Sequence, residues 1–317
     1  MNWFGAEIDG PMIATRTVHF TASAITAGAL IFRTFVAEPA LRVEPHAKAL
    51  VDRQIRFAAW IGVAFAILAG LTWVMLLTTS LSGESLGEAI VSGALRDVLT
   101  LTQFGWVSQV RLALATVLVI CLALERWPSW RLLALVAAVT LVASIAWTGH
   151  AASTLSALGY LHLASDALHL TAASAWIGGL VPLALLLDAI RCHPGWASME
   201  LDAVRRFSTL AIVSVAALIL SGLVNAWILV GSFRGLVLTS YGQLLMLKLA
   251  AFAVMLVFAV LNRFVLMLRL ALPSDEARQG ALHALSRSIL IEIALGLLIF
   301  AIVGVLGTQH PAAHLTK

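Results

Sequence analysis

The stretch Leu161–Leu180, LHLASDALHLTAASAWIGGL, decides the fold class and carries unusual side chains for its setting. It is apolar enough for a membrane-spanning helix, yet it contains His162, Asp166 and His169. Their i, i+4, i+7 spacing places the three on one helical face, which Trp176 continues. At 1.5 Å per residue, His169 lies about 12 Å into the helix, too deep for the headgroup layer of a core about 30 Å thick. Ionisable residues in a membrane helix usually face a cavity or the bundle interior, so this face predicts a site. The alternative interpretation is that these polar residues lie at a solvated helix end, near the lipid headgroups.

The composition is that of a polytopic membrane protein. Of 317 residues, 61% are hydrophobic and 11% are charged, whereas soluble domains carry about 25% charged residues. The formal net charge of +4 is expected to orient the chain in the membrane and not to bind nucleic acid. Cys121 and Cys192 are expected on the cytoplasmic side, where thiols stay reduced, so no disulfide is predicted.

Eight apolar runs are each long enough to span a bilayer. The sequence therefore predicts an all-α, polytopic membrane helical bundle that forms a single integral membrane domain over 1–317. The segment 80–104 is expected to be a loop with an amphipathic piece. The predicted helices cover residues 12–35, 57–79, 105–125, 130–148, 161–187, 207–231, 242–268 and 287–307.

Basic residues are distributed unevenly between the two sides of this bundle. Fourteen Lys and Arg fall in the connections after the first, third, fifth and seventh helices, and three fall on the other side. Basic connections stay in the cytoplasm. Both termini are therefore predicted to be periplasmic, which agrees with an even number of helices.

This orientation places six of the nine histidines at or above the outer half of the membrane. His19 and His169 lie at matched depths, each about 10 Å from the outer surface, so they could share a ligand. His310 and His314 are four residues apart and form a possible outer collecting site, or part of an incidental tail. The six are His19, His150, His162, His169, His310 and His314.

Other polar groups reach the same layer and offer structural alternatives. Asp166 could pair with Lys248 or Arg111 instead of serving a ligand. In the inner half, Glu292 could pair with Arg287 or Asn262, or it could take part in release on the cytoplasmic side.

Imidazole with carboxylate suits copper, zinc or iron. Asp166 lies one turn from both His162 and His169, so it could bind the metal or orient a histidine ligand. Sulfur is scarce on this side, with Met12 as one candidate, so a thioether path selective for copper(I) is not supported. No GxxxxGK[ST] motif is present, and ATP is not expected to drive the protein directly. No enzymatic activity is predicted.

Several stretches together resemble the CopD/PcoD family of copper resistance membrane proteins. They are HLASDALHLTAASAWIGGLVPL in the fifth helix, WTGHAA at 147–152, SGLVNAWILVGS at 221–232, YGQLLMLKLAAFAVMLVFAVLNRF at 241–264 and RSILIEIALGLLIFAIVGVLGTQHPAAH at 287–314.

The resemblance implies an inner membrane protein of eight helices that imports copper from the periplasm into the cytoplasm. It also implies a separate periplasmic copper carrier of the CopC type as partner. The candidate metal residues carried over are His150, His162, Asp166 and His169, and the depth argument adds His19. The oxidation state of the copper stays open.

Two alternatives remain. A haem b-binding electron-transfer protein of the cytochrome b561-like type would use two histidines at equal depth, either His19 or His150 with His169. Arg16, Arg111 and Lys248 would then partner the haem propionates, and such positive charges would repel a bare copper ion. The chain could also be a structural membrane partner of another copper protein.

Overall fold

The computed structural model describes residues 9–149, 157–191, 196–272, 275–310 and 313. Within these ranges it is an all-helical protein without β-strands. The main helices and the 3-10 and π segments that join or interrupt them are α1 (Gly10–Phe32), η1 (Arg33–Ala37), α2 (Glu38–Ala40), α3 (Pro45–Ser82), α4 (Leu86–Val91), α5 (Ala94–Leu101), α6 (Gln103–Ala123), α7 (Pro128–Ala143), η2 (Ser144–Thr148), α8 (Ala157–Ala173), η4 (Ser174–Gly178), α9 (Gly179–Arg191), α10 (Ala197–Val230), α11 (Phe233–Leu238), α12 (Ser240–Leu261), η6 (Asn262–Leu266), α13 (Met267–Leu270) and α14 (Asp275–Leu306).

Eight helical stretches of the described chain are long and apolar enough to cross a membrane, which confirms the predicted number. Several extend beyond the apolar runs from which they were predicted. The second begins at Pro45, where residue 57 was expected. Its 38 residues make a helix about 57 Å long, so its charged first turns continue past the hydrocarbon core. The eight stretches are Gly10–Ala40, Pro45–Ser82, Gln103–Ala123, Pro128–Thr148, Leu158–Arg191, Met199–Val230, Ser240–Leu270 and Arg278–Leu306.

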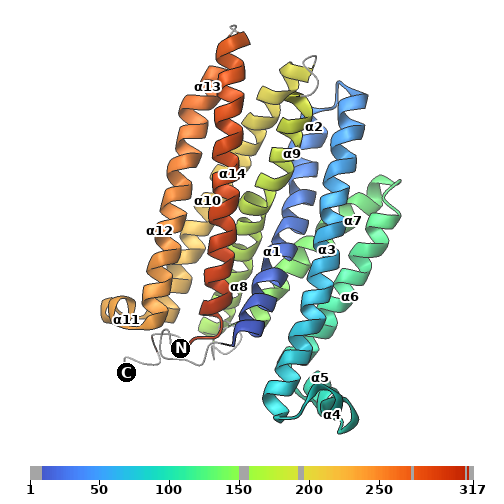
Figure 1. The fold of residues 1–317 in the computed structure, drawn as a ribbon, viewed down its shortest axis with the longest axis vertical. Helices are drawn as coiled ribbons and strands as arrows, with labels where there is room; N and C mark the ends of the chain where they lie inside the picture. Colours follow the sequence, from blue (N-terminus) through green and yellow to red (C-terminus); the bar gives the residue numbers. More distant parts are fainter. Residues whose placement is uncertain (1–8, 150–156, 192–195, 273–274, 311–312, 314–317) are drawn as a thin grey trace.

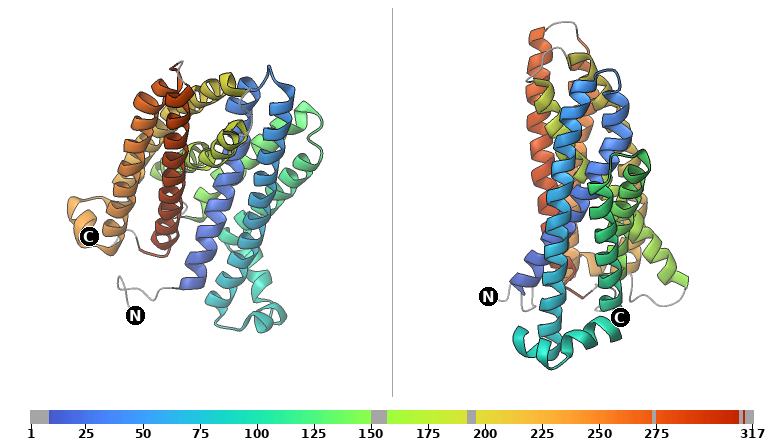
Figure 2. Two further views of the ribbon diagram at one scale, coloured as in Figure 1. Left: turned by 45° about the horizontal axis from the view of Figure 1, so that its top comes forward. Right: turned by 90° about the vertical axis from the view of Figure 1, so that its right-hand side faces the viewer.

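Helix α1 runs through the centre of the bundle (Figure 1). It packs against α3, α7, α14 and the π segment η4. Helices α3, α6 and α7 lie on one side of it, and α12 and α14 lie on the other (Figures 1 and 2). The start of α1 and the end of α14 are at the same end of the bundle, as an even number of spans requires. The side of the membrane on which this end lies remains a prediction from the basic residues.

The predicted loop at 80–104 contains two short helices, α4 and α5, which lie at this end of the bundle against α3 and α6 (Figure 1). A capping box begins α4, in which the backbone N–H of Glu88 donates to Ser85 Oγ and the Glu88 carboxylate accepts from the Ser85 N–H. Such reciprocal bonds satisfy the free donors of a helix start. The local polar sequence therefore favours helix, and the segment is more ordered than its composition suggested.

A buried ion-pair network holds the opposite end together. Arg33, one of the fourteen basic residues that the sequence assigns to the cytoplasmic connections, is only 3% exposed. Its guanidinium lies 2.5 Å from Glu125, just after the end of α6, and 3.3 Å from Asp52 of α3. Arg56 contacts the same Glu125 carboxylate at 3.0 Å. The network therefore joins the first span to α3 and α6.

We expect the Arg33→Met variant to lose about 3–5 kcal/mol of stability, because it removes the buried guanidinium that pairs with Glu125 and Asp52. Denaturant unfolding in detergent measures the loss. The matched control is Arg56→Met, whose side chain is 46% exposed, and for which about 1 kcal/mol or less is expected. Equal losses of stability in the two variants would show that the burial of Arg33 does not increase its contribution to stability.

Candidate metal site in the bundle

Helix α8 presents the predicted polar face toward its neighbours in the bundle. His162 is 1% exposed, and Asp166 and His169 are half-buried. The main partner of this face is α10. Ser165 Oγ donates a 3.0 Å hydrogen bond to the backbone carbonyl of Ser221. The predicted position inside the bundle is thus confirmed for these side chains.

The hydrogen bonds of His169 define which ring nitrogen is free. Its Nδ1 lies 3.0 Å from Ser221 Oγ. That hydroxyl donates its own proton to the Ala217 carbonyl at 2.6 Å, so it accepts from His169. Nδ1 therefore carries the hydrogen, and Nε2 keeps its lone pair. A neutral imidazole oriented in this way is suited to bind a metal ion through Nε2.

Asp166 is held by an amide and lies near a lysine. Asn225 Nδ2 of α10 donates to Asp166 Oδ1 at 3.2 Å. Lys248 of α12 is close enough to act electrostatically on both Asp166 and His169. Of the two predicted ion-pair partners of Asp166, Lys248 is thus a neighbour, whereas Arg111 binds elsewhere. We use the name second pocket for the group of side chains formed by His169, Asp166, Asn225 and Lys248; the name denotes these side chains and not a measured cavity.

His19 of α1 lies in a similar setting, which we name the first pocket together with Arg16, Trp73 and Arg111. Its Nδ1 lies 2.9 Å from the Ala66 carbonyl of α3 and must donate to it. Its Nε2 is buried and has no hydrogen-bond partner. This ring therefore also keeps a lone pair on Nε2.

Two guanidinium groups surround the ring of Trp73 beside His19. Arg16 lies 4.8 Å and Arg111 5.5 Å from the Trp73 ring centroid, and the His19 ring is 5.8 Å from it. Arg111 also donates to the Thr148 hydroxyl. Because like charges repel, the two arginines disfavour a cation at His19.

The two pockets occupy equivalent positions in a repeated sequence. The stretch ATRTVHFTA at 14–22 corresponds to ASDALHLTA at 164–172, and TQFGWVSQVRLA at 102–113 corresponds to TSYGQLLMLKLA at 239–250. His19 thus matches His169, and Arg111 matches Lys248. A search for short periods misses this repeat, because each unit is a group of four helices. Aligning the two halves of the chain would have found it.

The structure repeats the same details in both halves. Thr102 Oγ accepts from the Gly105 N–H at 2.9 Å, and Thr239 Oγ accepts from the Gly242 N–H at 3.0 Å. The two histidine rings rest on glycines, because an added Cβ would lie 3.4 Å from His19 at Gly70 and 3.5 Å from His169 at Gly222.

The two halves meet at a pair of equivalent glycines. A Cβ on Gly28 would overlap the backbone of Ser174 and Gly178, and a Cβ on Gly178 would overlap the backbone of Ala24 and lie 3.3 Å from Gly28 Cα. Equivalent residues thus contact each other reciprocally, as across a two-fold axis. Each half contributes four spans, so the two halves have the same orientation in the membrane. Repeats with the same orientation are related by an axis along the membrane normal.

Charge is the main difference between the equivalent pockets. Arg16 of the first pocket is replaced in the second by Asp166, while the basic position is kept as Arg111 and Lys248. The first pocket therefore contains two cationic side chains, and the second contains one cationic and one acidic side chain. On electrostatic grounds, the second pocket is the better environment for a cation.

The predicted metal residues are only partly brought together. Among the described residues, no three His, Cys, Asp or Glu side chains are grouped so that they could hold a metal ion. His19 and His169 bond to different helices, α3 and α10. His310 is exposed, and His150 and His314 lie outside the described residues. A Cβ added at Gly149 would lie 3.9 Å from Asp166 Oδ2, so the end of η2 comes close to the second pocket.

The remaining polar predictions have clear outcomes. Glu292 accepts a 2.6 Å hydrogen bond from Asn262, one of its two expected partners. Cys121 is a buried free thiol, and Cys192 lies outside the described residues.

The membrane-spanning helices and the buried imidazoles of His19 and His162 define a polytopic helical membrane protein with polar side chains inside the bundle. Comparisons with known proteins identify its family. Residues 7–160 match the model described as copper resistance protein D-like, N-terminal domain, and residues 201–306 match copper resistance protein D. The chain belongs to the copper resistance protein D family.

Three relatives support this assignment. The chain is 31% identical to copper resistance protein D of Pseudomonas syringae, over 80% of this chain and 82% of that protein. It is 29% identical to inner membrane protein YebZ of Escherichia coli, over 94% and 98% of the two chains. It is 30% identical to copper transport protein CutJ of Bacillus subtilis, over 90% of this chain but 50% of that protein. No solved structure matches. The protein is thus a multi-pass protein of the inner membrane.

Proposed function

We propose that the protein imports copper from the periplasm to the cytoplasm and that the ion binds in the second pocket. The observation that carries this proposal is the His169–Ser221 hydrogen bond, which leaves the lone pair of Nε2 available on the helical face that also carries Asp166. Imidazole and carboxylate are suitable copper ligands. The family membership and the names of the relatives support copper as the ion.

His162 and Asp166 would complete the contacts of the ion on α8, and His150 stays a sequence prediction as a further ligand. An incomplete set of protein ligands is consistent with transport, because an ion that binds too tightly cannot leave. We leave His19 out of the proposed ligand set, because the nearby charges of Arg16 and Arg111 would repel a cation.

The direction of import is proposed from topology. The positive-inside rule places the second pocket in the outer half of the bundle. A separate periplasmic carrier of the CopC type would deliver copper there, with His310 and His314 as a possible collecting site. The protein acts in this scheme as a carrier without enzymatic activity.

The test uses the full-length protein, stripped with a chelator and then titrated with copper. We expect saturable copper binding and, in proteoliposomes, copper uptake that protein-free liposomes do not show. Absence of both would overturn the proposal. Binding without uptake would support a structural or storage role.

A haem b protein is the second candidate, and one observation favours it. The unpartnered Nε2 of His19 lies beside a cavity of about 180 Å³ that is also lined by Trp73 and Arg111. Purified protein with a visible haem absorption band that is lost in the His19→Ala variant would establish this alternative. Colourless protein would remove it.

We expect the Ser221→Ala variant to bind copper about 10- to 100-fold more weakly, which is the usual effect of removing the group that orients a metal-binding histidine. Equilibrium titration measures the affinity. The control is Ser23→Ala, a buried hydroxyl of α1 with no hydrogen-bond partner. Unchanged affinity in Ser221→Ala would mean that the serine does not orient the ligand.

A further inference from the structure

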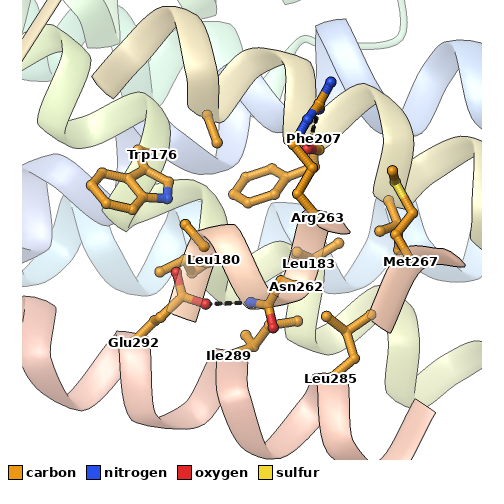
Figure 3. Close-up of a pocket in the computed structure, with 14 residues that line it drawn as sticks. Trp176, Leu180, Leu183, Phe207, Asn262, Arg263, Met267, Leu285, Ile289 and Glu292 are labelled. Carbon is orange, nitrogen blue, oxygen red and sulfur yellow. Dashed lines mark hydrogen bonds between the residues drawn. The ribbon is translucent and has the colours of Figure 1, made fainter. Parts of the chain in front are cut away.

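A small cavity lies between the π segments of two spans and the last helix (Figure 3). Its volume is about 50 Å³, which is room for a few water molecules. The lining includes Trp176 of η4, Asn262 and Arg263 of η6, and Glu292 of α14. We name it the inner cavity.

Glu292 is the acidic group of this cavity. It is 1% exposed and lies midway along the span Arg278–Leu306. Asn262 Nδ2 donates to its carboxyl at 2.6 Å, but an amide does not compensate a negative charge. None of the ion pairs among the described residues includes Glu292. A carboxylate in hydrocarbon is costly unless a proton or a cation neutralises it.

Arg263 is the other charged side chain among the described residues that line the cavity. Its guanidinium donates to Ser208 Oγ of α10 at 2.7 Å, and Figure 3 shows it directed away from Glu292. The carboxyl therefore has no cationic partner among the residues that the structure describes.

Two departures from α-helical geometry coincide at the cavity. Asn262 begins the π segment η6, and Trp176 lies within the π segment η4. A π turn widens the helix and costs regular hydrogen bonding, and such turns are frequent at functional sites. Both π segments face the same buried carboxyl. This coincidence indicates a functional cavity and not accidental packing.

The inner cavity lies further along the same span as the second pocket. Trp176 follows His169 by seven residues, or roughly 10 Å of helix. Its ring packs against Phe252 at 5.8 Å. An ion leaving the second pocket toward the predicted cytoplasmic side would therefore approach Glu292 after passing this aromatic pair.

We propose that Glu292 is a proton-exchanging site that couples proton release to the passage of copper; this proposal rests on the proposed function. When the cation approaches, it stabilises the carboxylate, and the carboxylic acid transfers its proton to water in the cavity. When the cation leaves, the carboxylate takes a proton back. One carboxyl with the Asn262 amide and the neighbouring Ser288 hydroxyl suits a proton, whereas a metal ion requires more charged or strongly coordinating ligands.

The first test is carbodiimide labelling of the wild-type protein, read by mass spectrometry. Hydrophobic carbodiimides react with protonated carboxyls in a membrane, so Glu292 is expected to be labelled and copper is expected to slow the reaction several-fold. Glu88 is the internal control. It is fully exposed, and hydrogen bonds from the Ser85 side chain and backbone hold its pKa below the usual value. An unlabelled Glu292 would overturn the proposal.

The second test compares the wild-type protein with the Glu292→Gln variant in proteoliposomes. We expect equal equilibrium copper binding, at least about tenfold slower uptake, and loss of the dependence of uptake on internal pH. Uptake at the wild-type rate with the wild-type pH dependence would overturn the coupling, even if copper import itself is established. If the wild-type protein neither binds nor imports copper, the proposed function fails, while carbodiimide labelling still reports on the proton site. Glu292→Asp, which keeps the acid, is expected to restore part of the pH dependence.

Discussion

Replacing His169 by alanine is expected to weaken equilibrium copper binding by at least about 100-fold, or roughly 2.8 kcal/mol. The change removes the Nε2 lone pair that the hydrogen bond to Ser221 leaves free in the second pocket. Copper titration of the purified protein measures the affinity. Asp166→Asn, which keeps the shape but removes the charge, is expected to have a smaller effect in the same direction.

The repeat provides a matched control for this experiment. His19→Ala removes the equivalent imidazole, whose ring also donates through Nδ1 and keeps Nε2 free. Because Arg16 and Arg111 surround that position, we expect its copper affinity to stay within about threefold of the wild-type value. Equal losses in both variants would show that the two pockets share one ion and that the electrostatic argument is wrong.

Replacing Gly178 by alanine is expected to destabilise the bundle by about 3 kcal/mol or more. The added Cβ would overlap the backbone of Ala24, and a backbone cannot rotate away as a side chain can. The change would separate α1 from η4 and thereby alter the spacing of the two halves. The midpoint of thermal unfolding in detergent and the yield of monodisperse protein measure the effect.

Two further variants make the glycine prediction specific. Gly28→Ala is expected to cost about as much, because the equivalent Gly28 meets the backbone of Ser174 and Gly178. Gly280→Ala in α14 is the control, since its Cβ would meet nothing within 4 Å. A tolerated Gly178→Ala variant would mean that the close approach of the two halves is not required for stability.

The repeat also explains why one fold carries two different pockets. The two histidine positions are alike in sequence, and the difference in charge between Arg16 and Asp166 is enough to make their electrostatics differ. Ser221 adds a hydroxyl beside His169 where the first half has Ala69. These two differences make the second pocket the better candidate for a cation.

The spans and the polar face of α8 could be predicted from the sequence, because both are local properties. Apolar run length determines whether a helix can cross the membrane, and i, i+4, i+7 spacing places His162, Asp166 and His169 on one face. The family resemblance and the Asn262 partner of Glu292 could also be predicted from the sequence. The extended start of α3 was not, because its first turns are polar and are stabilised beyond the apolar run.

Tertiary structure decided which groups meet. The sequence predicts that His19 and His169 lie at the same depth in the membrane. Their rings nevertheless bond to different helices, α3 and α10 respectively. The reason is that the side of a helix that faces a neighbour depends on packing between residues far apart in the sequence. The burial of Arg33, the π segments at the inner cavity and the reciprocal contact of Gly28 with Gly178 have the same origin. Hydropathy determines that a helix spans the membrane, whereas close packing of backbones and side chains between spans determines its neighbours.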